Sequence, residues 1–114
     1  MAFGTKAQFD AVRELAFGGI SGAYAPVGAP LTDHARIVRI SNSTNAEIYF
    51  SIDGTTNHIR MAVNGFVLFD FSTNRIQNDG LFLSVGTQFY AKQVSGAPTS
   101  GSVWVEVVSA IGGV

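Results

Sequence analysis

The sequence predicts an all-β domain, a single antiparallel β-sandwich with an N-terminal arm. From Arg36 onward, short segments of alternating polar and apolar residues are separated by clusters of Asn, Asp, Gly and Ser. These segments recur at spacings of about 8–12 residues, as they do in antiparallel sandwiches and barrels. At 114 residues, the chain has the size of one domain. We expect residues 1–10 to form the arm and residues 11–114 to form the sandwich.

The first third of the chain is less regular than the rest. Thr5 followed by Gln8 fits a helical capping box, but Gly18 and Gly19 would end any helix of useful length. We therefore expect a strand over residues 12–17, with Leu15 and Phe17 on one side. Residues 18–30 predict either a bent edge strand or a loop that lies against a neighbour.

The remaining segments read as strands because β-branched and aromatic residues dominate them. Residues 36–40 alternate imperfectly, so that Ile37 and Arg39 share a face. The almost wholly apolar run 66–71 predicts a strand covered on both faces. Asn64-Gly65 is a strong signal for a two-residue hairpin. The other expected strands are residues 47–52, 58–63, 87–94 and 102–109.

Alternation within these strands also predicts which residues form the core. Truncating a core residue such as Phe50 should lower the free energy of unfolding. A register error of one residue would exchange the two faces of its strand. The expected core residues are Ile48, Phe50, Ile52, Ile59, Met61, Val63, Leu68, Phe89, Val103, Val105 and Val107.

Charged residues are scarce in this chain and indicate an assembly component. They make up 13% of the sequence, against about 25% in an ordinary soluble domain, while 46% of the residues are hydrophobic. A small domain has much surface for its volume and normally shows many polar side chains to water. We therefore expect part of the surface to be covered by neighbouring subunits.

The same composition argues against several classes of partner. The seven basic residues are scattered, which disfavours direct contact with nucleic acid. No apolar run approaches the roughly 18 residues that span a bilayer, so we expect no membrane partner. Residues 1–10 lack the apolar segment and basic lead-in of a secretory signal. The absence of cysteine suits an intracellular origin.

The sequence offers no motif for catalysis, a metal or a cofactor, and we expect none of the three. A serine triad can be written from Ser51, Asp53 and His58, or with Asp33 and His34, but no nucleophile elbow supports either. Asp53 and Asp79 precede glycines in turns without the acidic spacing of a calcium loop. The interpretation as a non-enzymatic protein follows.

Five apolar or aromatic residues are candidates for an interface with neighbouring subunits. Phe3 and Phe9 lie in the arm, where a disordered tail would normally lack such residues. Trp104 alternates with Val103 and Val105, so it belongs either to a second core face or to a subunit contact, where Trp is enriched. Tyr24 lies in the Gly- and Ala-rich segment, and Ile111 lies in the uncharged C-terminus.

The order of segments resembles that of small β-sandwich virion proteins of tailed bacteriophages. The resemblance covers residues 15–109 and rests on strand and turn patterns: residues 19–31, then 35–45, 50–54, 65–70, 86–92 and 98–105. It implies a jelly-roll-like sandwich that acts as a capsid decoration or cement protein. No functional residue can be carried over, because the pattern contains none.

This resemblance implies a place in the virion, on the capsid or at the neck, after synthesis in the host cytoplasm. The implied partners are the major capsid protein or the portal and neck proteins, together with other copies of this chain. A head–tail connector component, such as a stopper or adaptor, is the alternative. A carbohydrate-binding module that uses Trp104 is the alternative from another class.

Overall fold

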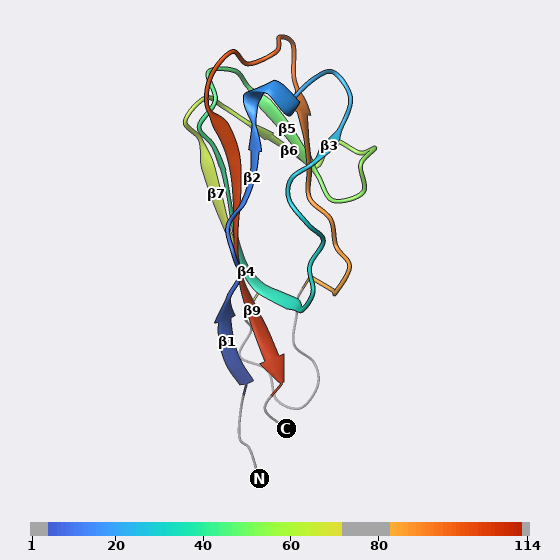
Figure 1. Ribbon diagram of the computed structural model, residues 1–114, viewed down its shortest axis with the longest axis vertical. Coiled ribbons are helices and arrows are strands. Elements are labelled where there is room, and N and C mark those ends of the chain that lie inside the picture. The colour runs from blue at the N-terminus through green and yellow to red at the C-terminus, as the bar shows by residue number, and fades with distance from the viewer. Residues whose placement is uncertain (1–4, 72–82, 113–114) are drawn as a thin grey trace.

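The structure is a computed structural model that describes residues 5–71 and 83–112. The described residues form nine strands and one short 3-10 turn, which confirms the all-β prediction (Figure 1). The turn η1 spans Phe17–Gly19. The strands are β1 (Thr5–Phe9), β2 (Arg13–Ala16), β3 (Ala25–Pro26), β4 (His34–Asn42), β5 (Ile48–Ser51), β6 (Ile59–Met61), β7 (Phe66–Asp70), β8 (Tyr90–Gln93) and β9 (Ser102–Gly112).

The strands form two antiparallel sheets that pack together as a sandwich. Sheet A has the order β1-β9-β4-β7, with β2 following β1 along the same edge of β9, and sheet B has the order β3-β8-β5-β6. If β1 and β2 count as one interrupted strand, the pairs are nested: first with last, then β3 with β8, β4 with β7 and β5 with β6. Successive pairs alternate between the sheets, which is the strand order of a jelly roll.

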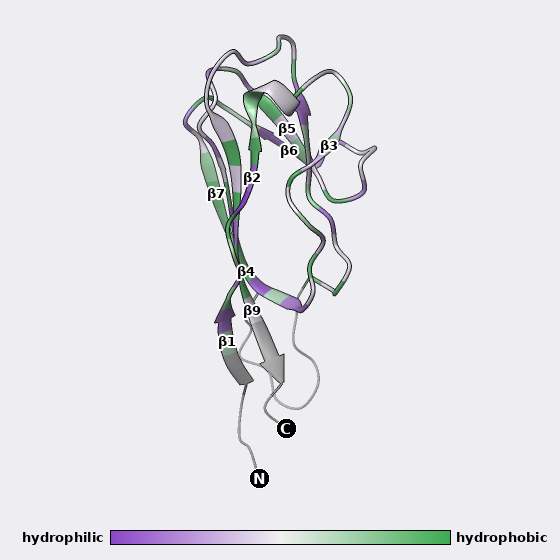
Figure 2. Cartoon of the chain, in the orientation of Figure 1, coloured by the Kyte–Doolittle hydropathy of each residue, from purple (hydrophilic) through white to green (hydrophobic). Residues whose placement is uncertain are grey.

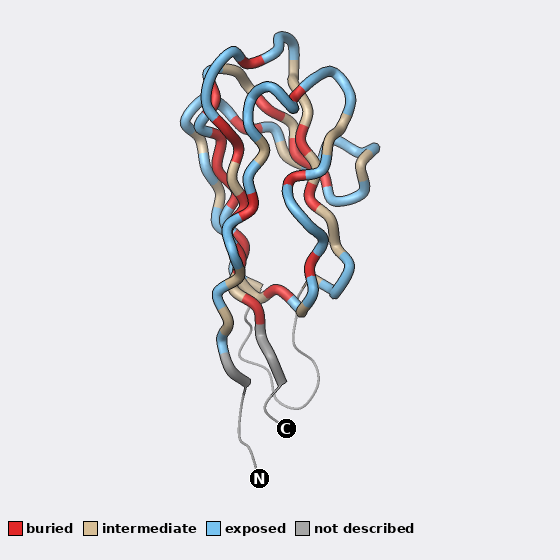
Figure 3. Tube along the Cα trace, viewed as in Figure 1, coloured by how far each residue is buried: buried red, intermediate tan, exposed pale blue. Residues whose placement is uncertain are grey.

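The core lies between the facing sides of the two sheets (Figure 3). Phe50, Phe89 and Val105 are almost completely buried there. Of the residues expected in the core, seven are buried and Ile59 packs partly buried against them. The seven confirmed residues are Ile48, Phe50, Met61, Phe89, Val103, Val105 and Val107. Strand alternation therefore predicted most of the core correctly.

Three predictions for the core are wrong. Ile52 and Val63 are 45% and 43% exposed, because β5 and β6 end before them and each residue lies in a turn. Leu68 is 57% exposed because the facing side of β7 carries Val67 and Phe69 instead. β7 is an edge strand whose outer side is uncovered, so the prediction of a strand covered on both faces is also wrong.

The prediction that residues 1–10 lie outside the strand pattern is wrong for residues 5–9. Here β1 pairs with the end of β9, from Thr5 opposite Gly112 to Phe9 opposite Val108. The two strands extend beyond the rest of the sandwich as a ribbon (Figure 1). The alternative of a capped helix at Thr5 is also excluded. The pairing arises because β9 is longer than the expected strand 102–109 and offers β1 an edge.

The Asn64-Gly65 pair forms a tight turn but not a hairpin. Asn64 has a positive φ of 62°, and the Gly65 N–H donates to the Ala62 carbonyl at 2.9 Å, as in a turn that places a left-handed residue third. The strands on either side, β6 and β7, belong to different sheets. The turn residues were therefore interpreted correctly, but the pairing inferred from them was wrong.

A bulge in β4 explains the imperfect alternation of residues 36–40. A register shift between Ala35 and Ile37 marks a bulge, and beyond it Val38 and Ile40 are buried. Ile37 and Arg39 consequently share the outer side, as expected. The segment 18–30 is mostly loop, with only the two residues of β3 pairing at the edge of sheet B.

Buried polar side chains fix the loops at the sheet edges. Arg13 is 9% exposed, and its guanidinium donates to the carbonyls of Ala29 and Pro30 at 2.8 and 3.4 Å. It also lies 3.5 Å from the Asp10 carboxylate, which accepts a hydrogen bond from Ser109. Buried charged groups need such partners. This network joins β2, β9 and the loop before Leu31.

Candidate functional site

The outer faces of the two sheets differ in character. Sheet B presents polar groups: Arg60 and Glu47 form an ion pair at 3.0 Å, and the Lys92 ammonium lies 4.8 Å from the centre of the Tyr24 ring. Sheet A exposes large hydrophobic side chains instead, with Phe66 63% exposed. Figure 2 shows hydrophobic residues along β7, at the edge of this sheet. An asymmetry of this kind marks sheet A as the candidate functional surface.

Strand register determines which side chains meet on the outer face of sheet A. Since Val103, Val105 and Val107 are buried, the alternate residues of β9 face outward. Cross-strand neighbours then line up in three rows. The rows are Glu14–Trp104–Ser41–Phe66, Glu106–Arg39–Leu68 and Phe9–Val108–Ile37–Asp70.

The end of this face nearest the β1–β9 ribbon is hydrophobic. We call it the apolar patch and define it as Phe9, Val12, Ile37, Leu68 and Val108. Phe9 is 82% exposed, Leu68 57% and Val12 53%. These five residues line one shallow depression of about 270 Å³. Such a group of exposed apolar side chains is typical of a surface that binds another macromolecule.

An ion pair lies at the centre of the face. The Arg39 guanidinium donates to the Glu106 carboxylate at 2.7 Å, and both side chains are about half-exposed. The guanidinium also lies 4.9 Å from the centre of the Phe66 ring, within cation–π distance. The two charges cancel, so the centre of the face is polar but electrically neutral.

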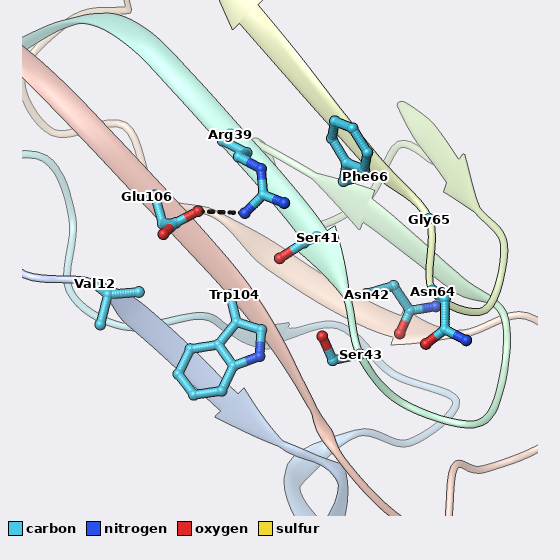
Figure 4. A pocket seen from close by; sticks show the side chains of 10 residues that line it. All are labelled: Val12, Arg39, Ser41, Asn42, Ser43, Asn64, Gly65, Phe66, Trp104 and Glu106. Atoms are coloured by element: carbon cyan, nitrogen blue, oxygen red, sulfur yellow. Dashed lines mark hydrogen bonds and ion pairs between the residues drawn. The ribbon is translucent and has the colours of Figure 1, made fainter.

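A second depression lies at the opposite end of the face from Phe9. We call it the Trp104 hollow; its volume is about 340 Å³. Figure 4 shows Trp104 and Phe66 on either side of Ser41, with Asn42, Ser43 and Asn64 at one end. The Arg39–Glu106 pair borders the hollow and also the apolar patch. The face thus combines an apolar end with a mixed aromatic and polar end.

Of the five residues expected at an interface, the structure places two on the same face. Phe9 and Trp104 both lie on the outer face of sheet A. Tyr24 lies on the other outer face, where its hydroxyl contacts Asn57 Oδ1 at 2.5 Å and its ring covers Lys92. Phe3 lies outside the described residues. Ile111 pairs with Lys6 in the ribbon, and its side chain lies outside the described part.

The residues of the first candidate triad do come together at the end of β5. Ser51 Oγ donates to Asp53 Oδ1 at 2.7 Å and accepts the backbone N–H groups of Asp53 and Gly54. His58 Nδ1 accepts the N–H of Ile52 at 3.2 Å. In a serine triad the hydroxyl proton passes to histidine. Here Ser51 Oγ lies 3.4 Å from His58 Nδ1 but only 2.7 Å from the Asp53 carboxylate. Ser51 is also 2% exposed, so the cluster stabilises the loop after β5.

Asp53 is the anchor of that loop. Backbone hydrogen bonds from Thr56 and Thr55, aided by Ser51, hold the pKa of Asp53 far below its ordinary value of 3.8. Both backbone bonds are 2.8 Å long. The carboxylate oxygen Oδ1 is therefore already occupied by donors within its own loop.

Asp33 and His34, the residues of the second candidate triad, bond to different parts of the chain. The Asp33 carboxylate accepts from Gln8, and His34 Nδ1 accepts the N–H of Val85. Asp79 lies outside the described residues. Within residues 5–71 and 83–112, no three His, Cys, Asp or Glu side chains gather in a way that could hold a metal ion. Over the same ranges, no helix is long and apolar enough to cross a membrane.

The sequence did not single out Leu68, Val12 or Ile37 as surface residues. For Leu68 the only signal was the almost wholly apolar run 66–71, which also fits a strand buried on both sides. Knowing that Leu68 pairs with Arg39, on the outer side of β4, would have placed Leu68 outside.

Comparison with known protein families, with curated proteins and with solved structures gives no match to this chain.

Proposed function

We propose that this protein is a non-enzymatic structural component of a tailed-phage virion, a decoration or cement protein that binds the outside of the capsid. The observation that carries the proposal is the apolar patch. Its most exposed member, Phe9, offers 82% of its surface to solvent. Burying apolar surface contributes about 25 cal/mol per Å², so an uncovered patch of this kind favours association with a partner.

The position of the patch fits attachment to a larger assembly. It adjoins the β1–β9 ribbon, which extends beyond the sandwich (Figure 1). A two-stranded ribbon alone has little stability in water, and contact with a partner would support it. The partners in this proposal are the major capsid protein and neighbouring copies of this chain.

The fold and composition are compatible with the proposal without being specific for it. A jelly roll occurs in viral coat proteins and in lectins alike, and a fold does not define a function. The scarcity of charge, 13% of residues, fits a protein whose surface is partly covered in its working state. The resemblance of the segment order to phage virion proteins supplies the particular setting.

Quantitative mass spectrometry of purified particles of the source phage tests the proposal. Hundreds of copies per particle are expected for a decoration protein. Six or twelve copies would instead assign the chain to the neck, as a stopper or adaptor. Absence from particles that contain all other structural proteins would contradict a virion role altogether.

A further inference from the structure

The Trp104 hollow adjoins the apolar patch, with which it shares Val12, and has the features of a small-ligand site. We propose that it binds one residue of a neutral carbohydrate. The hollow is lined by both aromatic rings and uncharged polar side chains. Its volume of about 340 Å³ falls at the lower end of the range of roughly 300–1,000 Å³ found for ligand pockets.

Sheet geometry sets the width of the hollow. Trp104 and Phe66 both pair with Ser41, one from β9 and the other from β7. Adjacent strands are about 4.8 Å apart, so the two aromatic residues are separated at the backbone by roughly 10 Å. The small Ser41 side chain between them leaves room for a sugar ring. The C–H bonds of a pyranose pack well against the electron-rich face of an aromatic ring.

Ser41 and Trp104 each present to the hollow a polar group that has no partner among the described residues. Ser41 is 9% exposed, and its hydroxyl makes no hydrogen bond to any residue in the described ranges. No described side chain has an unpartnered nitrogen or oxygen sealed from solvent, so the hollow gives access to the Ser41 hydroxyl. The Trp104 indole N–H likewise has no partner among the described residues. Solvent reaches both groups in the free protein, and the hydroxyls of a bound sugar would replace it as their hydrogen-bond partners.

Charge around the hollow favours a neutral ligand over an anionic one. Arg39 and Glu106 neutralise each other at 2.7 Å, and the remaining polar groups are the hydroxyls of Ser41 and Ser43 and the amides of Asn42 and Asn64. Asn42 already uses its amide within the protein. A uronic or sialic acid would therefore find no free positive charge at this site.

The single Trp of the chain provides the test, since its fluorescence reports on the hollow directly. The full-length protein is titrated with the methyl pyranosides of glucose, galactose, mannose and N-acetylglucosamine, and with glucuronic acid. We expect a saturable change with at least one neutral sugar and a dissociation constant on the order of 1 mM. Glucuronic acid should cause none.

Two substitutions in the hollow and one outside it complete the experiment. Ser41→Ala removes the unpartnered hydroxyl, and Asn64→Gly removes an amide while tolerating the positive φ. Each should weaken sugar binding by about tenfold, whereas Leu68→Lys in the apolar patch should leave it unchanged. The proposal is overturned if none of the four neutral sugars changes the fluorescence, or if glucuronic acid binds preferentially. It is also overturned if Ser41→Ala binds sugar with the same affinity as wild type.

The same variants separate this proposal from capsid attachment. If Ser41→Ala loses binding to particles, the hollow is part of the protein–protein contact and the carbohydrate proposal is wrong. If Leu68→Lys loses binding to particles but retains sugar binding, the two surfaces act independently.

Discussion

Thr44 and Asn42 are joined side chain to side chain, with Thr44 Oγ1 donating to Asn42 Oδ1 at 2.6 Å. The Asn42 amide in turn donates to the carbonyls of Ala46 and Ala62 at 2.8 and 3.1 Å. Asn42 is only 1% exposed. This one side chain thus ties the loop after β4 to the turn before β7, beside the Trp104 hollow.

Asn42→Ala should lower the free energy of unfolding by about 3 kcal/mol, because it leaves several buried groups without hydrogen bonds. Asn45→Ala is the matched control. Asn45 is exposed, and among the described residues its side chain bonds only to Thr99, so its loss should cost about 1 kcal/mol. Urea denaturation measures both. Equal losses would show that burial of the Asn42 network does not matter.

Gly101 is required for two reasons, whereas Gly86 is required for one. Both have a positive φ, 86° and 91°, but a Cβ on Gly101 would stand 2.0 Å from the Ser43 carbonyl oxygen while Gly86 faces open space. Gly86→Ala should cost about 1–2 kcal/mol through backbone strain alone. Gly101→Ala should cost clearly more in the same thermal denaturation assay. Comparable losses of stability would mean that Gly101 lies farther from Ser43 than it does in this structure.

The register of the core can be tested with two phenylalanines. Phe50 is 2% exposed and Phe66 is 63% exposed. Phe50→Ala should cost about 3–5 kcal/mol, whereas Phe66→Ala should change the stability by less than about 1 kcal/mol. Chemical denaturation gives both values. A larger loss for Phe66 would mean that β7 presents its other side to the core.

Stability should depend on the charge of Asp53 in acid. Since the pKa of Asp53 is depressed in the folded state, its ionised form stabilises the fold above about pH 4, and this contribution is lost as the pH falls. Asp53→Asn should therefore lower the melting temperature at about pH 6, and the difference from wild type should shrink towards about pH 2.5. A difference that stays constant with pH would contradict the proposed anchoring by the carboxylate.

Local patterns in the sequence predicted much of the sandwich, because alternation directly reflects which side of a strand is buried. Phe50 and Val105 are examples. The errors arose where pairing partners decide the outcome. Leu68 is exposed because its pairing with Arg39 places it on the outer side of sheet A. Thr5–Phe9 is a strand because β9 continues past Ser109 to offer it an edge. Neither fact can be read from the local residues.

The candidate site was predictable only in part for the same reason. Phe9 stood out as an apolar residue in the arm, and Trp104 as a residue of either a second core face or a subunit contact. Both lie on the outer face of sheet A. Tyr24 lies on the opposite face, since β3 pairs with β8 in sheet B. Ser41 gave no signal at all, because its position between two aromatic residues depends on the register of three strands.

Binding of the protein to particles that lack it tests the central claim most directly. Purified Leu68→Lys and Phe17→Lys proteins are added to such particles, and occupancy is measured by quantitative mass spectrometry. Both residues are exposed, but Phe17 lies beside Gly101, away from the apolar patch. We expect Phe17→Lys to bind like wild type and Leu68→Lys to lose most of its occupancy while both remain folded. Wild-type occupancy of Leu68→Lys would contradict attachment through the apolar patch.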